Sequence, residues 1–281
     1  RFIVPLFKAH DRSAFELYAF STARVPADST TALIRSLVDH FEVLPDGQRA
    51  AAARRLADCS LDLVIDLAGH TAPQQLEILA SRVAPLQLFF LGYPHGTGLS
   101  QMDGFITDDV ASPAAADEFA LERLLRLPHT AWTFDPQVTD LPTERVAGEG
   151  IVFGAFHNLA KISDGMLNLW ARVLSAVPGA KLAIGFRTNT EEGRQSLTRR
   201  LEGAGIPAQL VQFYPPIGSR EEHLGRLRSV DVVLDTFPYA GTTTTCEALW
   251  MGVPVVTLAG QTHASRVGAS LLTAVGLDSL V

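Results

Sequence analysis

The sequence has little of what several common kinds of functional site require. Its 281 residues include two cysteines, Cys59 and Cys246, each in a predicted helix in a different half of the chain. That number and spacing argue against a disulfide framework and a cysteine metal site, and they predict a reduced, cytoplasmic protein. With 23 basic against 30 acidic residues, the net charge is −7. This balance disfavours a nucleic-acid partner, which usually selects a basic face.

Long apolar runs and several signature motifs are also missing. No apolar stretch approaches the roughly 18 residues that cross a bilayer, so we expect no membrane span, and the N-terminus lacks the features of a signal peptide. The histidines have no metal-binding spacing, and no H-E-x-x-H motif occurs, so no metal is expected. There is no G-x-S-x-G or phosphate-loop motif, and no G-x-G-x-x-G follows the first strand of either half. The last absence argues against a dinucleotide-dependent oxidoreductase.

Short apolar runs alternate with amphipathic segments through both halves, which is typical of a parallel α/β fold. Residues 129–150 break this rhythm with four prolines or glycines and little periodicity, so they are predicted to link a first domain, 1–128, to a second, 151–281. Two Rossmann-like domains with parallel sheets are therefore expected. The predicted strands are 17–20, 63–67, 86–91, 105–107, 151–156, 181–184, 210–213, 232–234 and 255–258; the predicted helices are 31–40, 49–57, 73–81, 164–175, 191–204, 221–228, 243–250 and 264–274.

The most informative stretch runs from residue 232 to residue 266. A buried strand is followed by a hydroxyl-rich loop and then by a helix that begins near Thr243 and carries Glu247 one turn in. Threonine hydroxyls and the unpaired first-turn N–H groups of a helix suit a phosphate, and Glu247 would reach a ribose attached to it. A threonine-rich N-cap with a solvated glutamate explains the same residues without any ligand.

Two further groups of residues suggest a nucleotide. Asn158 and Lys161 lie in a predicted loop between a strand and a helix, where a lysine can neutralise the charge on a diphosphate. A surface lysine is the simpler interpretation, but a position near a helix start opposes the helix dipole and so favours the functional one. His223 and Arg226, three residues apart on a predicted helix, could pack on a base; a solvated helix face is the commoner meaning of such a pair.

Polar clusters follow several predicted strands at their carboxyl ends. They include His70, residues 93–98, residues 157–161 and residues 235–245. Ligands gather at the carboxyl ends of strands in open parallel sheets, so a single cleft is the economical interpretation. In the LGYPHGTG segment, small residues would permit close approach of a ligand, although a plain tight turn explains them equally well.

Taken together, the motifs resemble one family, the O-linked N-acetylglucosamine transferases. The matching segments run in family order over nearly the whole chain: DLAGHT, ILASRVAPLQLFFLGYP, MDGFITD, FGAFHNLAKIS, LWARVLSAVPGAKL, EEHLGRLRSVDVVLDTFPY and TTTTCEALWMGVPVVTLAGQTHASRVGASLL. The resemblance implies a GT-B type fold that binds UDP-N-acetylglucosamine between its two domains, without a metal or other cofactor. It also implies inverting transfer to Ser/Thr hydroxyls of a protein or peptide acceptor.

The resemblance also implies roles for individual residues. Lys161 matches the family's diphosphate-binding lysine and is the catalytic candidate, with Asp28 as a weaker match to an acidic residue that helps accept the acceptor's proton. On the sugar and acceptor side it places Leu91, Pro94 and His95. The nucleotide-binding set comprises Asn158, Lys161, Gly218, His223, Arg226, Thr242, Thr243, Thr244 and Glu247.

The sequence departs from the family in ways that leave alternatives open. Where the family has GYPGTTG this chain has GYPHGTG, so His95 and Gly96 replace Gly and Thr beside the sugar site. His95 is the reason to consider another donor, such as UDP-glucose or GDP-fucose. A non-catalytic binding module that keeps the fold is a separate alternative. The family's upstream histidine segment, last helices and tetratricopeptide repeats have no counterpart in this sequence. We therefore expect a piece of a longer chain, truncated at both ends and inactive alone, with its catalytic base outside it.

Overall fold

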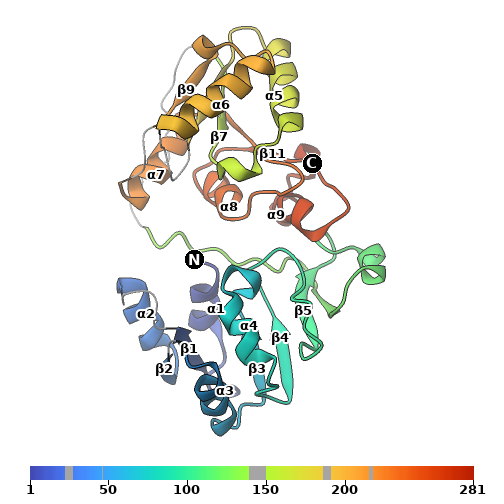
Figure 1. Cartoon of the computed structure of the whole chain (residues 1–281). Helices are drawn as coiled ribbons and strands as arrows, with labels where there is room; N and C mark the ends of the chain where they lie inside the picture. Colours follow the sequence, from blue (N-terminus) through green and yellow to red (C-terminus); the bar gives the residue numbers. More distant parts are fainter. Residues whose placement is uncertain (23–27, 46, 139–149, 186–190, 215–217) are drawn as a thin grey trace. The chain divides into compact units, whose positions relative to one another are not determined.

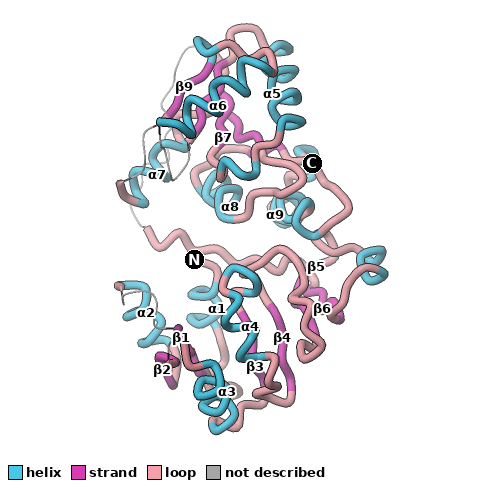
Figure 2. The backbone as a smooth tube through the Cα atoms, in the orientation of Figure 1, coloured by secondary structure: helices cyan, strands magenta, loops and turns pink. Residues whose placement is uncertain are grey.

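A computed structural model describes residues 1–22, 28–45, 47–138, 150–185, 191–214 and 218–281 (Figure 1). The chain divides into two compact units, Arg1–Asp135 and Pro136–Val281. Each is a layered α/β structure of parallel strands (Figure 2). No helix within the described ranges has both the length and the apolar character needed to cross a bilayer.

The first unit contains a four-stranded parallel sheet in the order β3-β4-β5-β6 and a separate parallel pair, β1-β2. Helices α3 and α4 pack on the larger sheet, where the Phe89 and Phe105 rings lie 5.1 Å apart in a core that also contains Leu56 and Ile78. The elements are α1 (Ile3–Ala9), β1 (Tyr18–Thr22), α2 (Ser29–Leu37), β2 (His40–Leu44), α3 (Arg49–Asp58), β3 (Leu63–Asp66), η1 (Gly69–Thr71), α4 (Pro73–Leu79), β4 (Leu86–Phe89), β5 (Gly104–Asp108), η2 (Ala114–Glu118) and β6 (Arg123–Leu127).

The second unit contains a five-stranded parallel sheet in the order β11-β10-β7-β8-β9. Apolar clusters on its two faces are centred on Trp170 and Leu182 in one case and on Val233 and Leu272 in the other. A sheet covered on both faces explains why its strands are continuous apolar runs in the sequence. The elements are β7 (Val152–Ala155), η3 (Leu159–Lys161), α5 (Asp164–Ala176), β8 (Lys181–Ile184), α6 (Glu191–Gly203), η4 (Ala208–Leu210), β9 (Val211–Phe213), α7 (Arg220–Leu227), β10 (Val232–Leu234), α8 (Thr243–Trp250), β11 (Val255–Val256), η5 (His263–Ser265), α9 (Val267–Ala274) and η6 (Asp278–Leu280).

Most predicted elements occur within a few residues of their expected limits, and the exceptions have local causes. The helix expected at 31–40 begins at Ser29, because Asp28 caps it, and ends at Leu37, because residues 40–44 form β2. The helix expected at 264–274 begins at Val267, after the 3₁₀ turn η5. Helix α1 and strands β2 and β6 were not predicted from the sequence.

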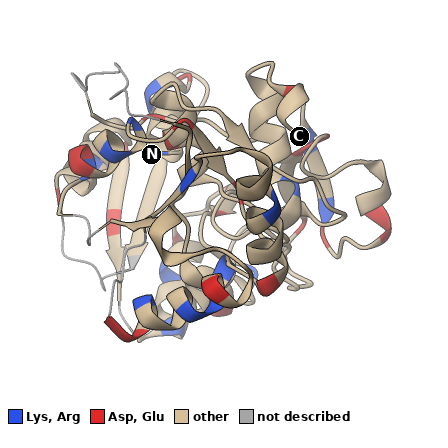
Figure 3. Ribbon diagram, turned by 90° about the horizontal axis from the view of Figure 1, so that it is seen from above, with Lys and Arg blue, Asp and Glu red and all other residues tan. Residues whose placement is uncertain are grey.

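The predicted linker falls partly outside the described residues, since residues 139–149 are not among them. Residues before that gap pack on the first unit: the Trp132 ring lies 5.9 Å and the Phe134 ring 5.7 Å from the ring of Phe2. The domain limits at 128 and 151 stay predictions. Basic and acidic residues occur close together on several helices (Figure 3). In the sequence they are interleaved along α6 and α7.

Candidate functional site

The order of the strands locates the candidate site in the second unit. From β7 the chain adds β8 and β9 on one side, then returns to add β10 and β11 on the other. The order therefore reverses between β7 and β10, and in open α/β sheets ligands bind outside the carboxyl ends of the strands at such a switch point. Residues 157–161 follow β7 and residues 235–245 follow β10. The structure thus brings together the two segments that the sequence analysis selected.

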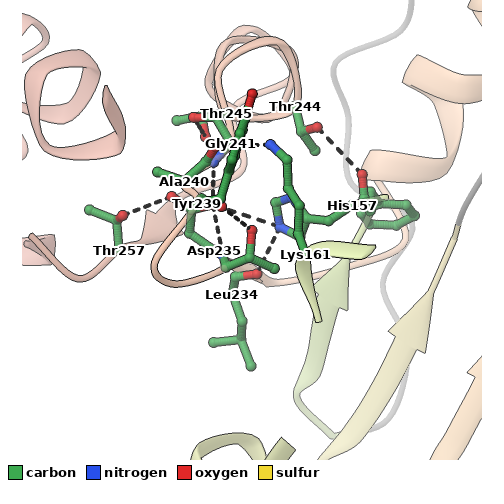
Figure 4. A network of polar contacts seen from close by, with 12 residues as sticks. His157, Lys161, Leu234, Asp235, Tyr239, Ala240, Gly241, Thr244, Thr245 and Thr257 are labelled. Carbon is green, nitrogen blue, oxygen red and sulfur yellow. Dashed lines mark hydrogen bonds and ion pairs between the residues drawn. The ribbon is translucent and has the colours of Figure 1, made fainter. Parts of the chain in front are cut away.

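Lys161 ends the short turn η3 and extends toward the loop that follows β10 (Figure 4). Its Nζ donates to the Ala240 carbonyl at 3.0 Å and lies 3.7 Å from the centre of the Tyr239 ring. Burial lowers the pKa of this amine to about 8, and the negative charge of Asp235 opposes that shift. Near neutral pH the group is therefore an ammonium whose proton is held less tightly than in an ordinary lysine.

Asp235 holds the loop after β10 in place through hydrogen bonds. One carboxylate oxygen accepts from the N–H groups of Thr236 at 2.8 Å and Gly241 at 2.7 Å, and the other accepts from Thr257 Oγ1 at 2.7 Å. Asp235 is 5% exposed. Because it is buried and bonded to groups on both sides of the turn, it fixes the path of residues 235–241.

His157 is a second buried polar group beside this loop. Its Nε2 donates to the Leu234 carbonyl at 3.0 Å and lies 3.9 Å from Asp235 Oδ1. Burial lowers the pKa of His157, while the nearby Asp235 carboxylate acts in the opposite direction. A neutral ring that donates through Nε2 fits both observations.

The threonine cluster forms the start of α8, as predicted. Thr242 occupies the N-cap position but, among the described residues, makes no side-chain capping bond, and Thr243 is half-buried. Thr244 Oγ1 contacts the Phe156 carbonyl at 3.4 Å, and Thr245 Oγ1 donates to the Gly241 carbonyl at 3.1 Å. The cluster therefore places hydroxyls and first-turn N–H groups at the positive end of a helix, close to the Lys161 partners Tyr239 and Ala240.

Glu247 is not the solvated residue that the simpler interpretation required. It is 2% exposed, and its Oε2 contacts His223 Nε2 at 2.9 Å. Glu247, assigned to the ribose, and His223, assigned to the base, are therefore hydrogen-bonded to each other. The same α8 residue borders Cys246, whose thiol pKa is raised to about 12, first by burial and then by the charge of Glu247.

Arg226 and Gly218 lie beside this pair. The Arg226 guanidinium pairs with Glu222 and lies 5.5 Å from the centre of the Tyr214 ring. Glu222 also accepts from the Gly218 N–H at 2.9 Å, so the backbone group expected to contact a base is bonded within the chain. Asn158 caps η3 by accepting from the Ala160 N–H at 3.1 Å. All the residues assigned to the nucleotide therefore belong to the second unit.

The sugar-side residues belong to the first unit, in the loop after β4. Leu91 has a φ of +68°, a left-handed conformation that is uncommon for a residue with a side chain. Pro94 is buried, and His95 is exposed. The loop approaches the segment after β3 closely, because a Cβ on Gly92 would lie 2.0 Å from the Leu67 carbonyl oxygen.

Asp28 has a structural role that was not predicted from the sequence. It is the N-cap of α2, where its carboxylate accepts from the Thr31 N–H at 2.8 Å and Thr31 Oγ1 at 3.0 Å. The bond from the Thr31 N–H lowers the pKa of Asp28. The capping box explains this residue without catalysis, and its role in accepting a proton stays a prediction.

Three residues of the site, His157, Asp235 and Tyr239, had no predicted role. His157 and Asp235 fell within the predicted polar clusters, and Tyr239 follows a proline in the same loop. The available signal was their position after β7 and β10, but nothing local distinguished their tasks. Among the described residues, no group of three or more His, Cys, Asp or Glu side chains could hold a metal ion.

The chain is similar to known proteins over nearly its whole length. The sequence profile of glycosyl transferase family 41 matches residues 3–139 and 137–281. The probable UDP-N-acetylglucosamine–peptide N-acetylglucosaminyltransferase SPINDLY of Arabidopsis thaliana is 39% identical over 97% of this chain. That match covers 30% of the SPINDLY sequence, so the chain spans under a third of this relative.

Solved structures give a consistent picture. A variant of the O-GlcNAc transferase of Thermobaculum terrenum superposes with a TM-score of 0.93 and 35% identity, over 100% of this chain and 54% of that one. A lipopolysaccharide outer core galactosyltransferase superposes with a TM-score of 0.55 at 12% identity, over 90% and 74% of the two chains, which is a likeness of fold alone. These likenesses confirm the predicted GT-B type of fold.

Proposed function

The chain belongs to glycosyl transferase family 41, and we propose that the natural protein transfers N-acetylglucosamine from UDP-N-acetylglucosamine to Ser/Thr hydroxyls of proteins. The observation that carries the proposal is the cluster at the β7–β10 switch point. There the Lys161 ammonium and the threonines at the start of α8 lie around one loop. Such a cluster suits a pyrophosphate.

In the proposed reaction, the acceptor hydroxyl attacks C1 of the sugar from the face opposite the leaving group. A new C1–O bond forms, the C1–O bond to UDP breaks with inversion, and the hydroxyl proton passes to a base. Lys161, Thr243, Thr244 and the α8 dipole stabilise the charge that develops on the departing diphosphate. Asp28 is the weaker candidate for handling the acceptor's proton.

The remaining nucleotide contacts follow from the same arrangement. Glu247 would accept from a ribose hydroxyl, while His223 and Arg226 would pack around the base and Gly218 would offer it a backbone contact. Asn158 and Thr242 would border the diphosphate. The direct bond between His223 and Glu247 supports this assignment, because it holds a base-contacting ring and a ribose-contacting carboxylate side by side.

We propose that transfer needs no metal, because a buried ammonium and a helix N-terminus can supply the positive charge that a cation would otherwise provide. Activity should therefore persist in EDTA. Loss of activity on chelation, with recovery on adding Mn²⁺ or Mg²⁺, would contradict this part. The free thiols Cys59 and Cys246 are the support for a cytoplasmic setting.

The test is a calorimetric and kinetic panel of UDP-N-acetylglucosamine, UDP-glucose and GDP-fucose with the full-length natural protein. We expect UDP-N-acetylglucosamine to bind and to support transfer to a protein acceptor. Preference for the guanine nucleotide would overturn the uracil assignment of His223 and replace the donor. Absence of binding to every nucleotide would leave a non-catalytic module as the better account.

A further inference from the structure

Glu122, in the first unit, is a buried acid that the proposed reaction does not use. It directly precedes β6 and is 5% exposed. Its Oε1 accepts from the Thr97 N–H at 2.5 Å, from Thr97 Oγ1 at 2.6 Å and from the Gly98 N–H at 2.9 Å. One carboxylate oxygen thus gathers three donors from a loop that lies 24–25 residues earlier in the chain.

The second oxygen of Glu122 accounts for the glycine at position 96, where the family has threonine. A Cβ placed on Gly96 would lie 2.1 Å from Glu122 Oε2, closer than real Cβ atoms come to any neighbour. The carboxylate therefore occupies the space that a side chain at position 96 would need. Gly96 and Glu122 are a matched pair, and a threonine at position 96 would displace the acid from its present position.

The same loop is held from another element as well. His70, in η1 after β3, donates from Nε2 to the Thr97 carbonyl at 2.9 Å, and its ring lies 5.1 Å from that of Tyr93. Thr97 is therefore bonded through its N–H, its hydroxyl and its carbonyl. This exceeds what a simple tight turn requires, and it leaves the neighbouring His95 exposed in a fixed part of the loop.

We propose that Glu122 is a positioning residue that fixes the 94–98 loop, and that through this loop it sets which donor sugar is accepted. The loop follows the carboxyl end of β4, the edge at which open parallel sheets bind ligands. The effect on the sugar rests on the proposed function. The effect on the loop does not, because it follows from the three bonds and from Gly96.

Amide exchange tests the loop directly, without any need for activity. Deuterium uptake of the peptide spanning residues 91–98 is followed by mass spectrometry in the full-length natural protein. We expect exchange at the Thr97 and Gly98 amides to be about tenfold faster or more in Glu122→Ala, because hydrogen bonds to a carboxylate protect them. Glu122→Gln keeps an accepting Oε1 and should stay near wild type, as should the exposed control Glu118→Gln. Equal exchange in Glu122→Ala and wild type would overturn the proposal.

Donor selection is measured as the ratio of kcat/KM for UDP-N-acetylglucosamine to that for UDP-glucose. We expect this ratio to change at least about fivefold in Glu122→Ala and in Gly96→Ala, since each moves the loop. The Kd of UDP should stay within about twofold, because the assigned nucleotide contacts lie in the other unit. Adding Gly96→Ala to Glu122→Ala should change the ratio little further, because the clashing oxygen is gone. Gly96→Ala also serves where Glu122→Ala fails to fold.

The outcomes separate this inference from the proposed function. An active enzyme whose donor ratio is the same in wild type, Glu122→Ala and Gly96→Ala would overturn the role in sugar selection. A wild-type protein that uses no nucleotide sugar would remove the proposed function and that role together. The exchange result would still decide whether Glu122 holds the loop.

Discussion

Lys161 gives the sharpest prediction, because its charge changes close to neutral pH. With a pKa of about 8, its ammonium fraction is about 0.9 at pH 7 and about 0.1 at pH 9. If the ammonium stabilises the leaving diphosphate, kcat/KM should fall about tenfold between these pH values. The alkaline fall in kcat should occur at a higher pH than the fall in kcat/KM, because a bound diphosphate favours the charged form of the amine.

Replacing Lys161 by methionine removes the charge and keeps much of the side-chain volume. We expect kcat to fall about 10²–10³-fold, the range seen when one group that stabilises transition-state charge is removed. UDP affinity should fall by less than about tenfold, because the threonines and the helix N-terminus remain. The assay is initial rates from pH 6.5 to 9.5, with calorimetric UDP titration at pH 7. Lys181→Met, at the exposed start of β8, is the matched control.

Two results would refute this reasoning. One is a Lys161→Met enzyme with a wild-type kcat, which would remove the lysine from the chemistry. The other is an unchanged alkaline limb in the residual activity of that variant, which would assign the limb to a different group. A weaker UDP affinity with an unchanged kcat would instead mean that Lys161 stabilises the ground state and the transition state equally.

Further predictions concern stability and binding. The pKa of Lys161 is lowered from 10.5 to about 8, so between these pH values the unfolded chain binds more protons than the folded chain. The unfolding free energy of wild type, measured in urea relative to Lys161→Met, should therefore rise with pH through that window. Asp235→Ala should lower the unfolding free energy by about 3 kcal/mol in the same assay, because it leaves the Thr236 and Gly241 N–H groups without their acceptor, whereas the exposed Asp109→Ala should have little effect. His223→Ala should weaken UDP binding about tenfold by calorimetry, and unchanged affinity would withdraw its assignment to the base. Trp170→Ala should cost about 3–5 kcal/mol of unfolding free energy, since the ring is 1% exposed; a loss under about 1 kcal/mol would contradict the packing described.

The sequence predicted the second unit better than the first, for a physical reason. Strands such as Lys181–Ile184 and Val232–Leu234 lie within a sheet covered on both faces, so they are short apolar runs with clear limits. The missed strand β6, Arg123–Leu127, is an edge strand with exposed ends, and β2 belongs to a sheet of two. Charged residues, Arg123 and Arg126 in β6 and Glu42 in β2, interrupt the continuous apolar run on which the prediction depended.

Some residues of the candidate site were predictable from the sequence and others were not. Lys161 could be selected because a cation is disfavoured near the start of a helix, and Thr243 because it belongs to a run of four threonines there; both are local properties of the sequence. The tasks of Asp235 and Tyr239 depend on which groups the folded chain brings to them. Nothing in the sequence says that one carboxylate accepts from the N–H groups of Thr236 and Gly241, which are five residues apart.

Asp235 and Glu122 have the same role in their respective units. Each is 5% exposed, each accepts three hydrogen bonds from N–H and O–H donors, and each leaves no room for a Cβ on a nearby glycine, Gly268 for Asp235 and Gly96 for Glu122. A buried carboxylate bonded in this way resists displacement, because moving it would leave several donors unpaired at once. The loops after β4 and β10 are therefore held in place before any ligand arrives. Stabilising a leaving group with N–H groups, hydroxyls and one ammonium requires such preorganisation, since each of these groups is weak unless already in position.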